Sequence, residues 1–160
     1  MDYRDGSKFK VRLIGNDGKV VGAGEIVKFT LKGKTYKVKT KKNGYAYLPI
    51  KLVPKTYKIT AEYKGYKISN KIKVKSVIKA KNISKKKSKK IKYTATLKTS
   101  KGKVLKAKKV IFKIKGKTYK AKTNKKGVAK IYLKNLKVGK HKITIKYLSS
   151  TLKKTITVKK

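Results

Sequence analysis

The sequence predicts an all-β chain that folds as two tandem antiparallel β-sandwiches, and two observations lead to this fold class. The first is an internal repeat, because the stretch Gly33–Thr40 (GKTYKVKT) returns in the second half of the chain as Gly116–Thr123 (GKTYKAKT). The second is the alternation of apolar residues with lysine along short stretches that glycine-containing turns separate, without helical periodicity. Each copy contains a full set of such stretches, so we expect two domains, residues 1–76 and 77–160.

The first copy is predicted to contain about six strands. Their expected ranges are 9–13, 26–31, 36–40, 45–50, 57–63 and 68–74. Along 26–31, the residues Val27, Phe29 and Leu31 share one face, as a half-buried strand requires. Gly33-Lys34 is a candidate two-residue hairpin, and Asn43-Gly44 is the strongest short hairpin signal in the chain. The first copy therefore follows the pattern of an antiparallel sandwich.

The second copy is predicted to contain seven strands. Their expected ranges are 77–83, 91–99, 109–114, 118–123, 128–133, 141–147 and 152–158. The strand over 77–83 has no counterpart at the start of the first copy. We therefore expect that the first domain lacks its first strand, which would precede Tyr3 in a longer polypeptide.

The charge of the chain is extreme, because 51 Lys and Arg residues face only five Asp and Glu residues, a net charge of +46. Arginine occurs only twice, and no acid follows Glu62. The five acids are Asp2, Asp5, Asp17, Glu25 and Glu62. A surface of this kind attracts polyanions and repels its own kind, so we expect a monomer that associates with anionic polymers.

Candidate residues for catalysis and metal binding are scarce. The chain has no cysteine, and its one histidine, His141, lies in a copy that has no carboxylate to orient it. Comparison of the copies places His141 where Thr56 stands, which predicts a position on the strand surface. Calcium requires several carboxylate or carbonyl oxygens, and Asp17 is better explained by its turn. We expect no enzyme activity, no cofactor and no metal, and we expect Glu62 to pair with a lysine on the surface.

The densest run of charge is the most plausible binding site in the sequence. It comprises Lys85, Lys86, Lys87, Lys89 and Lys90. Such a run is typical of polyanion-binding patches, and the alternative is a solvated loop between two strands. Tyr36 and Tyr119 could stack on bases, but their place in alternating strands favours packing in the core. No known nucleic-acid-binding motif appears, so any contact with nucleic acid would be directed at its phosphate backbone.

The stretch 102–133 (GKVLKAKKVIFKIKGKTYKAKTNKKGVAKIYL) resembles the immunoglobulin-like (Ig-like) repeats of adhesin-like surface proteins from methanogenic archaea. The resemblance covers nearly the whole chain and rests on the order and spacing of short motifs in both copies. In the second copy the matching residues are Val110, Phe112, Gly116, Lys117, Thr118, Tyr119, Gly127, Ala129, Leu133, Gly139, Ile143, Thr144 and Tyr147. In the first copy they are Val27, Phe29, Gly33, Lys34, Thr35, Tyr36, Gly44, Ala46, Leu48, Ile59, Thr60 and Tyr63, with Pro54 at the expected position of Gly139.

This resemblance implies two tandem Ig-like domains that act as structural and adhesive stalk modules outside the cell. The implied partners are anionic cell-wall or surface polysaccharides, or the surface of another cell. The first residues show no signal peptide, and no stretch is long and apolar enough for a membrane span. The alternatives are a cytoplasmic basic protein that binds nucleic acid non-specifically and an accessory domain of a wall enzyme. For the fold, the alternative is a transthyretin-like sandwich.

Overall fold

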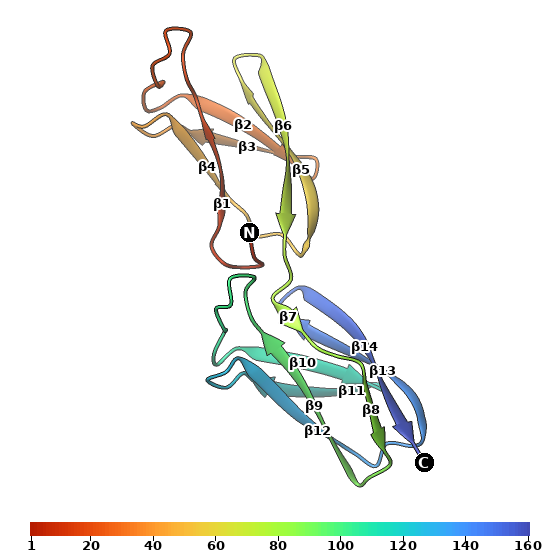
Figure 1. The fold of residues 1–160 in the computed structure, drawn as a ribbon. Coiled ribbons are helices and arrows are strands. Elements are labelled where there is room, and N and C mark those ends of the chain that lie inside the picture. Colours follow the sequence, from red (N-terminus) through yellow and green to blue (C-terminus); the bar gives the residue numbers. More distant parts are fainter. The chain divides into compact units, whose positions relative to one another are not determined.

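The computed structural model describes residues 1–160 and consists of strands, turns and loops (Figure 1). The chain divides into two compact units, Met1–Lys75 (unit 1) and Ser76–Lys160 (unit 2). The chain forms no helix with the length and apolarity that a membrane span requires. The strands of unit 1 are β1 (Lys8–Arg12), β2 (Ile26–Leu31), β3 (Lys34–Lys39), β4 (Tyr45–Pro49), β5 (Lys55–Tyr63) and β6 (Tyr66–Val74). Those of unit 2 are β7 (Ile78–Lys79), β8 (Ile83–Lys86), β9 (Lys90–Leu97), β10 (Lys109–Ile114), β11 (Lys117–Lys122), β12 (Val128–Lys134), β13 (Gly139–Tyr147) and β14 (Ser150–Lys159).

Each unit is a sandwich of two sheets with Ig-like strand order. In unit 1 the sheets are β1-β4 and β3-β2-β5-β6, and in unit 2 they are β12-β9-β7 and β11-β10-β13-β14-β8. Strands β10, β13 and β14 lie side by side although two strands intervene between the first two, which is the C-F-G arrangement of Ig-like domains. Neighbouring strands are antiparallel except β8, which runs parallel to β14. The predicted Ig-like fold is therefore confirmed.

The core of each unit comes from the alternating apolar residues of its strands. Val27, Phe29 and Leu31 are buried on β2, as predicted, and Lys28 between them is exposed. The equivalent ring in unit 2, Phe112, is also buried. Phe29 packs edge-to-face against Phe9, with ring centroids 5.9 Å apart, and Phe112 packs in the same way against Tyr93 at 6.1 Å. The two sheets of each unit are thus joined by the same aromatic contact.

The β2–β3 hairpin turns one residue earlier than predicted. Its central residues are Lys32 and Gly33, with φ of 53° and 71°, and Lys34 already pairs with Leu31. Two consecutive residues with positive φ form the tight turn whose twist matches that of antiparallel strands. The prediction of Gly33-Lys34 was therefore wrong by one position, because the glycine supplies the second positive φ and not the first.

Asn43-Gly44 does not join paired strands, contrary to the prediction of a hairpin. This turn connects β3 in one sheet to β4 in the other. Gly44 lies against a neighbouring segment, and its carbonyl accepts a hydrogen bond of 2.9 Å from the Leu13 N–H. A Cβ at Gly44 would lie 2.9 Å from the Leu13 carbonyl oxygen, so the glycine is needed for close backbone approach.

Unit 2 has eight strands where seven were predicted. The predicted strand 77–83 is divided, because β7 pairs with β9 and β8 crosses to the other sheet beside β14. Two hydrogen bonds hold the crossing. The Tyr93 hydroxyl donates to the Lys81 carbonyl (2.9 Å), and the Thr155 N–H donates to the Asn82 side chain (2.9 Å). Local alternation cannot show where a strand changes sheets, because the change depends on distant partners.

Unit 1 begins at the place that the end of β8 holds in unit 2. The Tyr3 N–H donates to the Lys75 carbonyl (2.9 Å), as the Lys87 N–H donates to the Lys159 carbonyl (2.8 Å). Tyr3 is buried. Strand β1 pairs with β4 alone, whereas its equivalent β9 pairs with both β12 and β7. No residue of unit 1 therefore occupies the position of β7.

Candidate polyanion-binding surface and an open groove

The five lysines of the predicted patch lie at the end of unit 2 where β8 passes to β9. We call them the lysine edge: Lys85, Lys86, Lys87, Lys89 and Lys90. The first two belong to β8, the next two lie in the connecting loop, and Lys90 begins β9. The sequence predicted a loop for the whole run, so the structure corrects about half of it to strand. All five side chains are exposed.

The backbone under the lysine edge is held by hydrogen bonds. The Ser88 hydroxyl donates to the Lys90 carbonyl (2.9 Å), and the Asn135 N–H donates to the Lys89 carbonyl (3.1 Å). The Lys90 ammonium lies 4.5 Å from the centre of the Tyr132 ring, a cation–π contact. Unit 2 has no Asp or Glu, so no side-chain carboxylate of this unit balances these charges. The edge therefore combines a hydrogen-bonded backbone with exposed charge that no side-chain carboxylate of the unit balances.

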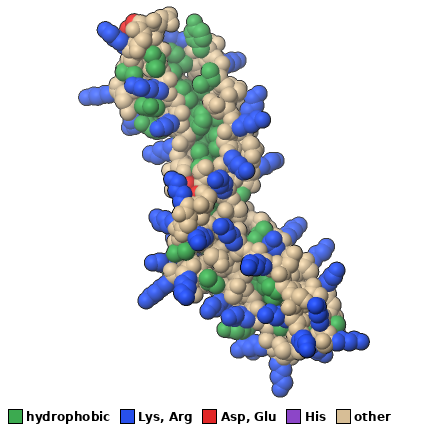
Figure 2. Space-filling model, in the orientation of Figure 1, with side chains coloured by type: hydrophobic (Ala, Val, Ile, Leu, Met, Phe, Trp, Pro, Cys, Tyr) green, Lys and Arg blue, Asp and Glu red, His purple; other side chains and the backbone are tan.

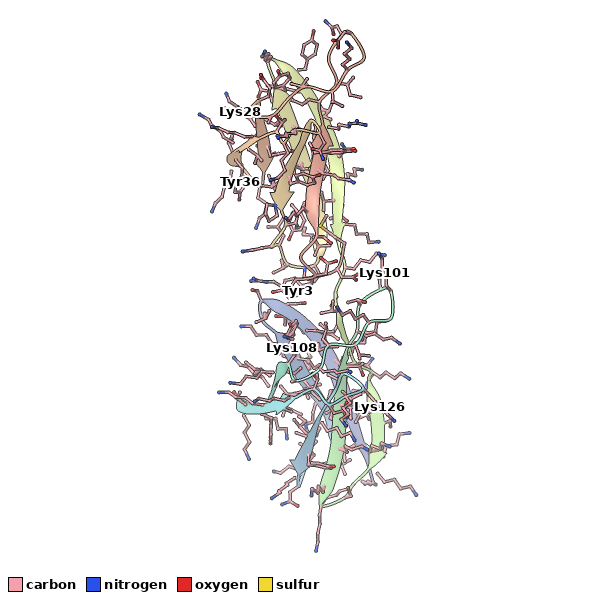
Figure 3. The ribbon with its side chains drawn as sticks, turned by 90° about the vertical axis from the view of Figure 1, so that its left-hand side faces the viewer. Tyr3, Lys28, Tyr36, Lys101, Lys108 and Lys126 are labelled. Carbon is pink, nitrogen blue, oxygen red and sulfur yellow. The ribbon has the colours of Figure 1, made fainter.

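Lysine also covers the outer faces of the strands. On β13, Lys140, Lys142 and Lys146 are exposed and alternate with the buried side chains of His141, Ile143 and Ile145. Lysines at every second position lie about 7 Å apart along a strand. Their side chains project from strands and loops alike (Figure 3), and basic side chains are spread over the whole visible surface (Figure 2).

The acids of unit 1 interact locally. The Tyr63 hydroxyl donates to Glu25 (2.8 Å), and the Lys64 ammonium lies 3.9 Å from the same carboxylate. The pKa of Lys64 is raised by its hydrogen bond to Tyr63 and by the nearby charge of Glu25. The surface ion pair expected at Glu62 is thus formed by Glu25 instead. Glu62 stands opposite Lys28 in the β2–β5 register, but the ion pair forms at the hairpin next to it.

His141 is buried, which corrects the prediction of a surface position. Its Nε2 lies 2.7 Å from the Lys137 carbonyl oxygen. In the structure its equivalent is Tyr57, whose hydroxyl donates to the Val53 carbonyl at 2.8 Å, so the earlier alignment was wrong by one residue. The same shift places Lys55, and not Pro54, at the position of Gly139. The histidine ring thus links β13 to the carbonyl of the loop that precedes it. No group of three or more His, Cys, Asp or Glu side chains is placed to hold a metal ion.

Tyr36 and Tyr119 lie on the edge strands β3 and β11, opposite Phe29 and Phe112. Tyr36 is 40% exposed and Tyr119 is half-buried. The prediction that both pack in the core was therefore wrong. Alternation places them on the inner side of their strands, but the opposite sheet does not extend over the edge.

A groove in unit 1 is the second candidate site, and sequence reasoning did not locate it. It has a volume of about 470 Å³ and runs between the end of β1 and the β5–β6 hairpin. Its apolar lining includes Val11, Leu13, Ile14, Tyr66 and Ile68. Figure 2 shows hydrophobic side chains gathered on this face of the unit. The signal in the sequence was the absence of a counterpart to residues 77–83.

No protein-family model matches the chain, and no curated protein matches it. Solved structures with similar folds include the D0-D1 domain of intimin, which is 19% identical over 99% of this chain and 94% of that one, with a TM-score of 0.41. The D00-D0 domain of intimin is 20% identical over 99% and 95%, with a TM-score of 0.44. Invasin, described as a bacterial integrin-binding protein, is 17% identical over 97% of this chain but 36% of its own, with a TM-score of 0.41. With identities of 20% or less and TM-scores below 0.5, this likeness does not transfer a function.

Proposed function

We propose that the two Ig-like units are non-catalytic stalk and adhesive modules of a cell-surface protein that associates with anionic wall or surface polymers. An extracellular role follows the resemblance of the sequence to the adhesin-like repeats of methanogenic archaea. The exposed lysines of the strands and loops attract the anionic polymer, and they are most closely spaced at the lysine edge. Lysine suits this role because its ammonium is a mobile point charge that needs no fixed partner geometry.

One observation supports this proposal most directly. Unit 2 contains 31 basic residues and no acid, and its exposed lysines alternate with a complete apolar core. A stable sandwich needs the inner positions to be apolar but leaves the outer ones free, so structure alone does not require lysine there. Repulsion among these uncompensated lysines also destabilises the folded unit. An anionic partner is therefore the simplest explanation for their number.

The test is binding of the full chain to an isolated anionic wall polysaccharide, with heparin and duplex DNA as reference polyanions. We expect saturable binding to all three, which weakens steeply as NaCl rises because bound counterions are released. Reversal of the lysine edge to glutamate, with five substitutions, should weaken every polymer by a similar factor. Binding that resists high salt with one polymer alone would contradict the proposal, because it would require a shaped site.

A matched control variant reverses five exposed lysines of the same unit, four in the β9–β10 connection and one at the start of β10. They are Lys101, Lys103, Lys106, Lys108 and Lys109. Both variants change the net charge by the same amount. The lysine-edge variant should lose more affinity than the control, because its five lysines lie closer together along the chain (residues 85–90) than those of the control (residues 101–109). Equal losses would show that attachment is spread evenly over the unit. Tighter binding of DNA than of wall polymer would favour a nucleic-acid-binding role.

A further inference from the structure

A pocket lies in unit 2 where the chain crosses from one sheet to the other between β7 and β8. It has a volume of about 510 Å³ and lies against the outer face of β9. We call it the crossing pocket. Ligand pockets in proteins have volumes of about 300–1,000 Å³, so it has room for a small ligand or one unit of a polymer. Four lysines and two threonines are among the residues that line it: Lys79, Lys81, Lys85, Lys92, Thr94 and Thr96.

The pocket exists because β9 extends beyond the end of β7. Strand β7 pairs with β9 through its two residues only. Two residues further, the same register would place Lys81 opposite Thr94. Instead, the Lys81 carbonyl accepts a hydrogen bond of 2.9 Å from the Tyr93 hydroxyl, as the chain turns inward to cross. The Thr94 N–H therefore has no backbone acceptor on the side of the pocket.

Both walls of the pocket are held in place. One wall is β9, which pairs along its length with β12. The other wall is the crossing segment, which the bond from Tyr93 to Lys81 holds at one point. A second bond holds it at Asn82, whose side chain accepts from the Thr155 N–H at 2.9 Å. A ligand that enters walls already in place requires less ordering of the protein, and this favours its binding.

The lining combines positive charge with unused hydrogen-bonding groups. The four lysine side chains are exposed, and unit 2 has no carboxylate side chain to neutralise them. The hydroxyls of Thr94 and Thr96 are half-buried and make no hydrogen bond within the chain. Ammonium groups attract an anion, whereas hydroxyls both donate and accept. The lining therefore fits a ligand that carries negative charge and hydroxyl groups together.

An exposed aromatic ring lies beside the pocket on the same face of the sheet. Tyr132 of β12 is 48% exposed and stands directly opposite Lys92 of β9. Opposite residues on one face have Cβ atoms about 4.5–5.5 Å apart, so the ring adjoins the lining. The Lys90 ammonium lies 4.5 Å from the centre of this ring. Unit 1 has Pro49 at the equivalent position, so the fold does not require an aromatic side chain there.

We propose that the crossing pocket and Tyr132 bind an acidic sugar unit of an anionic polysaccharide. The carboxylate or sulfate group of the sugar lies among the lysines of the pocket, and its hydroxyls bond to Thr94 and Thr96. The weakly apolar C–H face of the sugar packs on the exposed part of the Tyr132 ring. This inference rests on the proposed function and names the chemical class of the polymer. Ammonium groups supply the attraction, so the contact weakens with salt as that of the other lysines does.

The test measures binding of small labelled anions to the full chain in about 0.05 M NaCl by fluorescence anisotropy. One probe is a tetrasaccharide of galacturonic acid, and another is a galactose tetrasaccharide with one sulfate on each sugar. The control is a capped tetraglutamate peptide, which has the same number of charges but no sugar ring or hydroxyl. We expect one tetrasaccharide to bind each chain, at least tenfold more tightly than tetraglutamate. Comparison of the two sugars shows whether carboxylate or sulfate is preferred.

Two double variants with the same net charge locate the anionic group. Lys81→Gln with Lys92→Gln removes two charges from the pocket, whereas the Lys81 carbonyl keeps its bond to Tyr93. Lys113→Gln with Lys117→Gln removes two exposed charges from the β10–β11 hairpin, which does not line the pocket. The first should weaken tetrasaccharide binding at least tenfold, and the second should leave it within about twofold. Circular dichroism checks that both variants fold.

Two further variants test the sugar ring. Tyr132→Ser should weaken both tetrasaccharides at least fivefold but leave tetraglutamate within about twofold, because only the sugars contact the ring. Tyr66→Ser removes a ring of unit 1 that is 79% exposed, and it should change neither. In the unmodified protein, the amide resonance of Thr94 should shift during titration with the tetrasaccharide and not with tetraglutamate.

Three results would overturn the inference. The first is equal binding of the tetrasaccharides and tetraglutamate, and the second is equal weakening by the two double variants. The third is tighter binding of tetrathymidylate that depends on Tyr132, because a nucleic acid would then be the occupant. After the first two results, salt-dependent binding of the long polymers would still support the proposed function. If none of the long polymers binds, the proposed function itself fails.

Discussion

Units 1 and 2 have the same core but differ in surface charge and in one sheet edge. Unit 1 contains 20 basic residues and five acids, a net charge of +15, whereas unit 2 contains 31 basic residues and no acid, a net charge of +31. Each acid of unit 1 has a lysine as its equivalent in unit 2. The pairs are Asp2 and Lys86, Asp5 and Lys89, Asp17 and Lys101, Glu25 and Lys108, and Glu62 and Lys146.

The interior contacts are kept where the surface changes. Thr40 and Thr123 are both buried, and each hydroxyl donates to a carbonyl of the loop before β2 or β10, at 2.7 and 2.6 Å. Each also accepts an N–H bond, from Glu25 at 3.1 Å and from Lys108 at 2.9 Å. The comparison teaches that this sandwich depends on its inward positions and on a few buried polar links. The outward positions tolerate a doubled charge.

Removal of the central ring should have the largest effect and should be similar in the two units. Phe112→Ala and Phe29→Ala should each cost about 3–5 kcal/mol of the free energy of unfolding, because each ring is fully buried between the sheets. Lys113→Ala, one residue further and exposed, should cost less than about 0.5 kcal/mol. Hydrogen exchange resolved by unit measures all three. A large cost in one unit alone would show that the cores are not equivalent.

Loss of the buried threonine link should rank second. Thr40→Val and Thr123→Val keep the shape of the side chain but leave the carbonyl and the N–H of these part-buried hydrogen bonds without their partner. We expect each to cost about 1–3 kcal/mol. The matched control is Thr118→Val on β11, where the side chain is exposed. If the control costs as much as the buried pair, strand propensity and not the hydrogen bonds explains the effect.

Tyr93 should give unit 2 a dependence on alkaline pH that the equivalent residue of unit 1, Phe9, cannot give. Burial raises the pKa of Tyr93 to about 12 from 10.0, so folding favours the neutral phenol. This contribution is complete below about pH 10 and is lost as pH rises from 10 to 12. Tyr93→Phe should cost about 1 kcal/mol at neutral pH through the lost bond to Lys81.

Denaturant unfolding of Tyr93→Phe and the unmodified protein, followed across this pH range, tests the assignment. Their stability difference should fall as pH rises from 10 to 12 and should change sign, because a rise in pKa from 10.0 to about 12 corresponds to about 2.7 kcal/mol, which exceeds the lost hydrogen bond. Neutralisation of the lysines occurs in both proteins, so it cancels in the difference. A constant difference would mean that the phenol does not ionise differently in the folded and unfolded chains.

The smallest effect should come from transfer of the acids to unit 2. Lys101→Asp, Lys108→Glu and Lys146→Glu copy Asp17, Glu25 and Glu62, and each should stabilise unit 2 by up to about 0.5 kcal/mol at low salt. Screening should remove the gain, since the Debye length falls from about 30 Å at 0.01 M to about 8 Å at 0.15 M. The Tm of the unmodified protein should likewise rise with NaCl, more in unit 2 than in unit 1. A gain that persists at high salt would point to packing and not to charge.

Much of the fold could be predicted from local patterns. The inward faces of β2 and β10, the positions of most strands and the exposure of the five edge lysines all follow from the alternation of apolar residues with lysine. A strand has a period of two residues, so its own sequence defines its two faces. The repeat then supplied the number of copies, because each stretch of the first has a partner in the second.

Other features depended on segments that are distant in the sequence. The division of 77–83 into β7 and β8, the passage of Asn43-Gly44 between sheets and the burial of His141 all depend on which strand lies alongside. The exposure of Tyr36 has the same origin. Alternation places its side chain on the inward side of β3, but only residues of the opposite sheet could bury it. The groove of unit 1 is a further case, since Ile14 and Ile68 are uncovered only because no strand occupies the place of β7. Alternation specifies the face of each residue, whereas burial requires a second surface that local sequence does not specify.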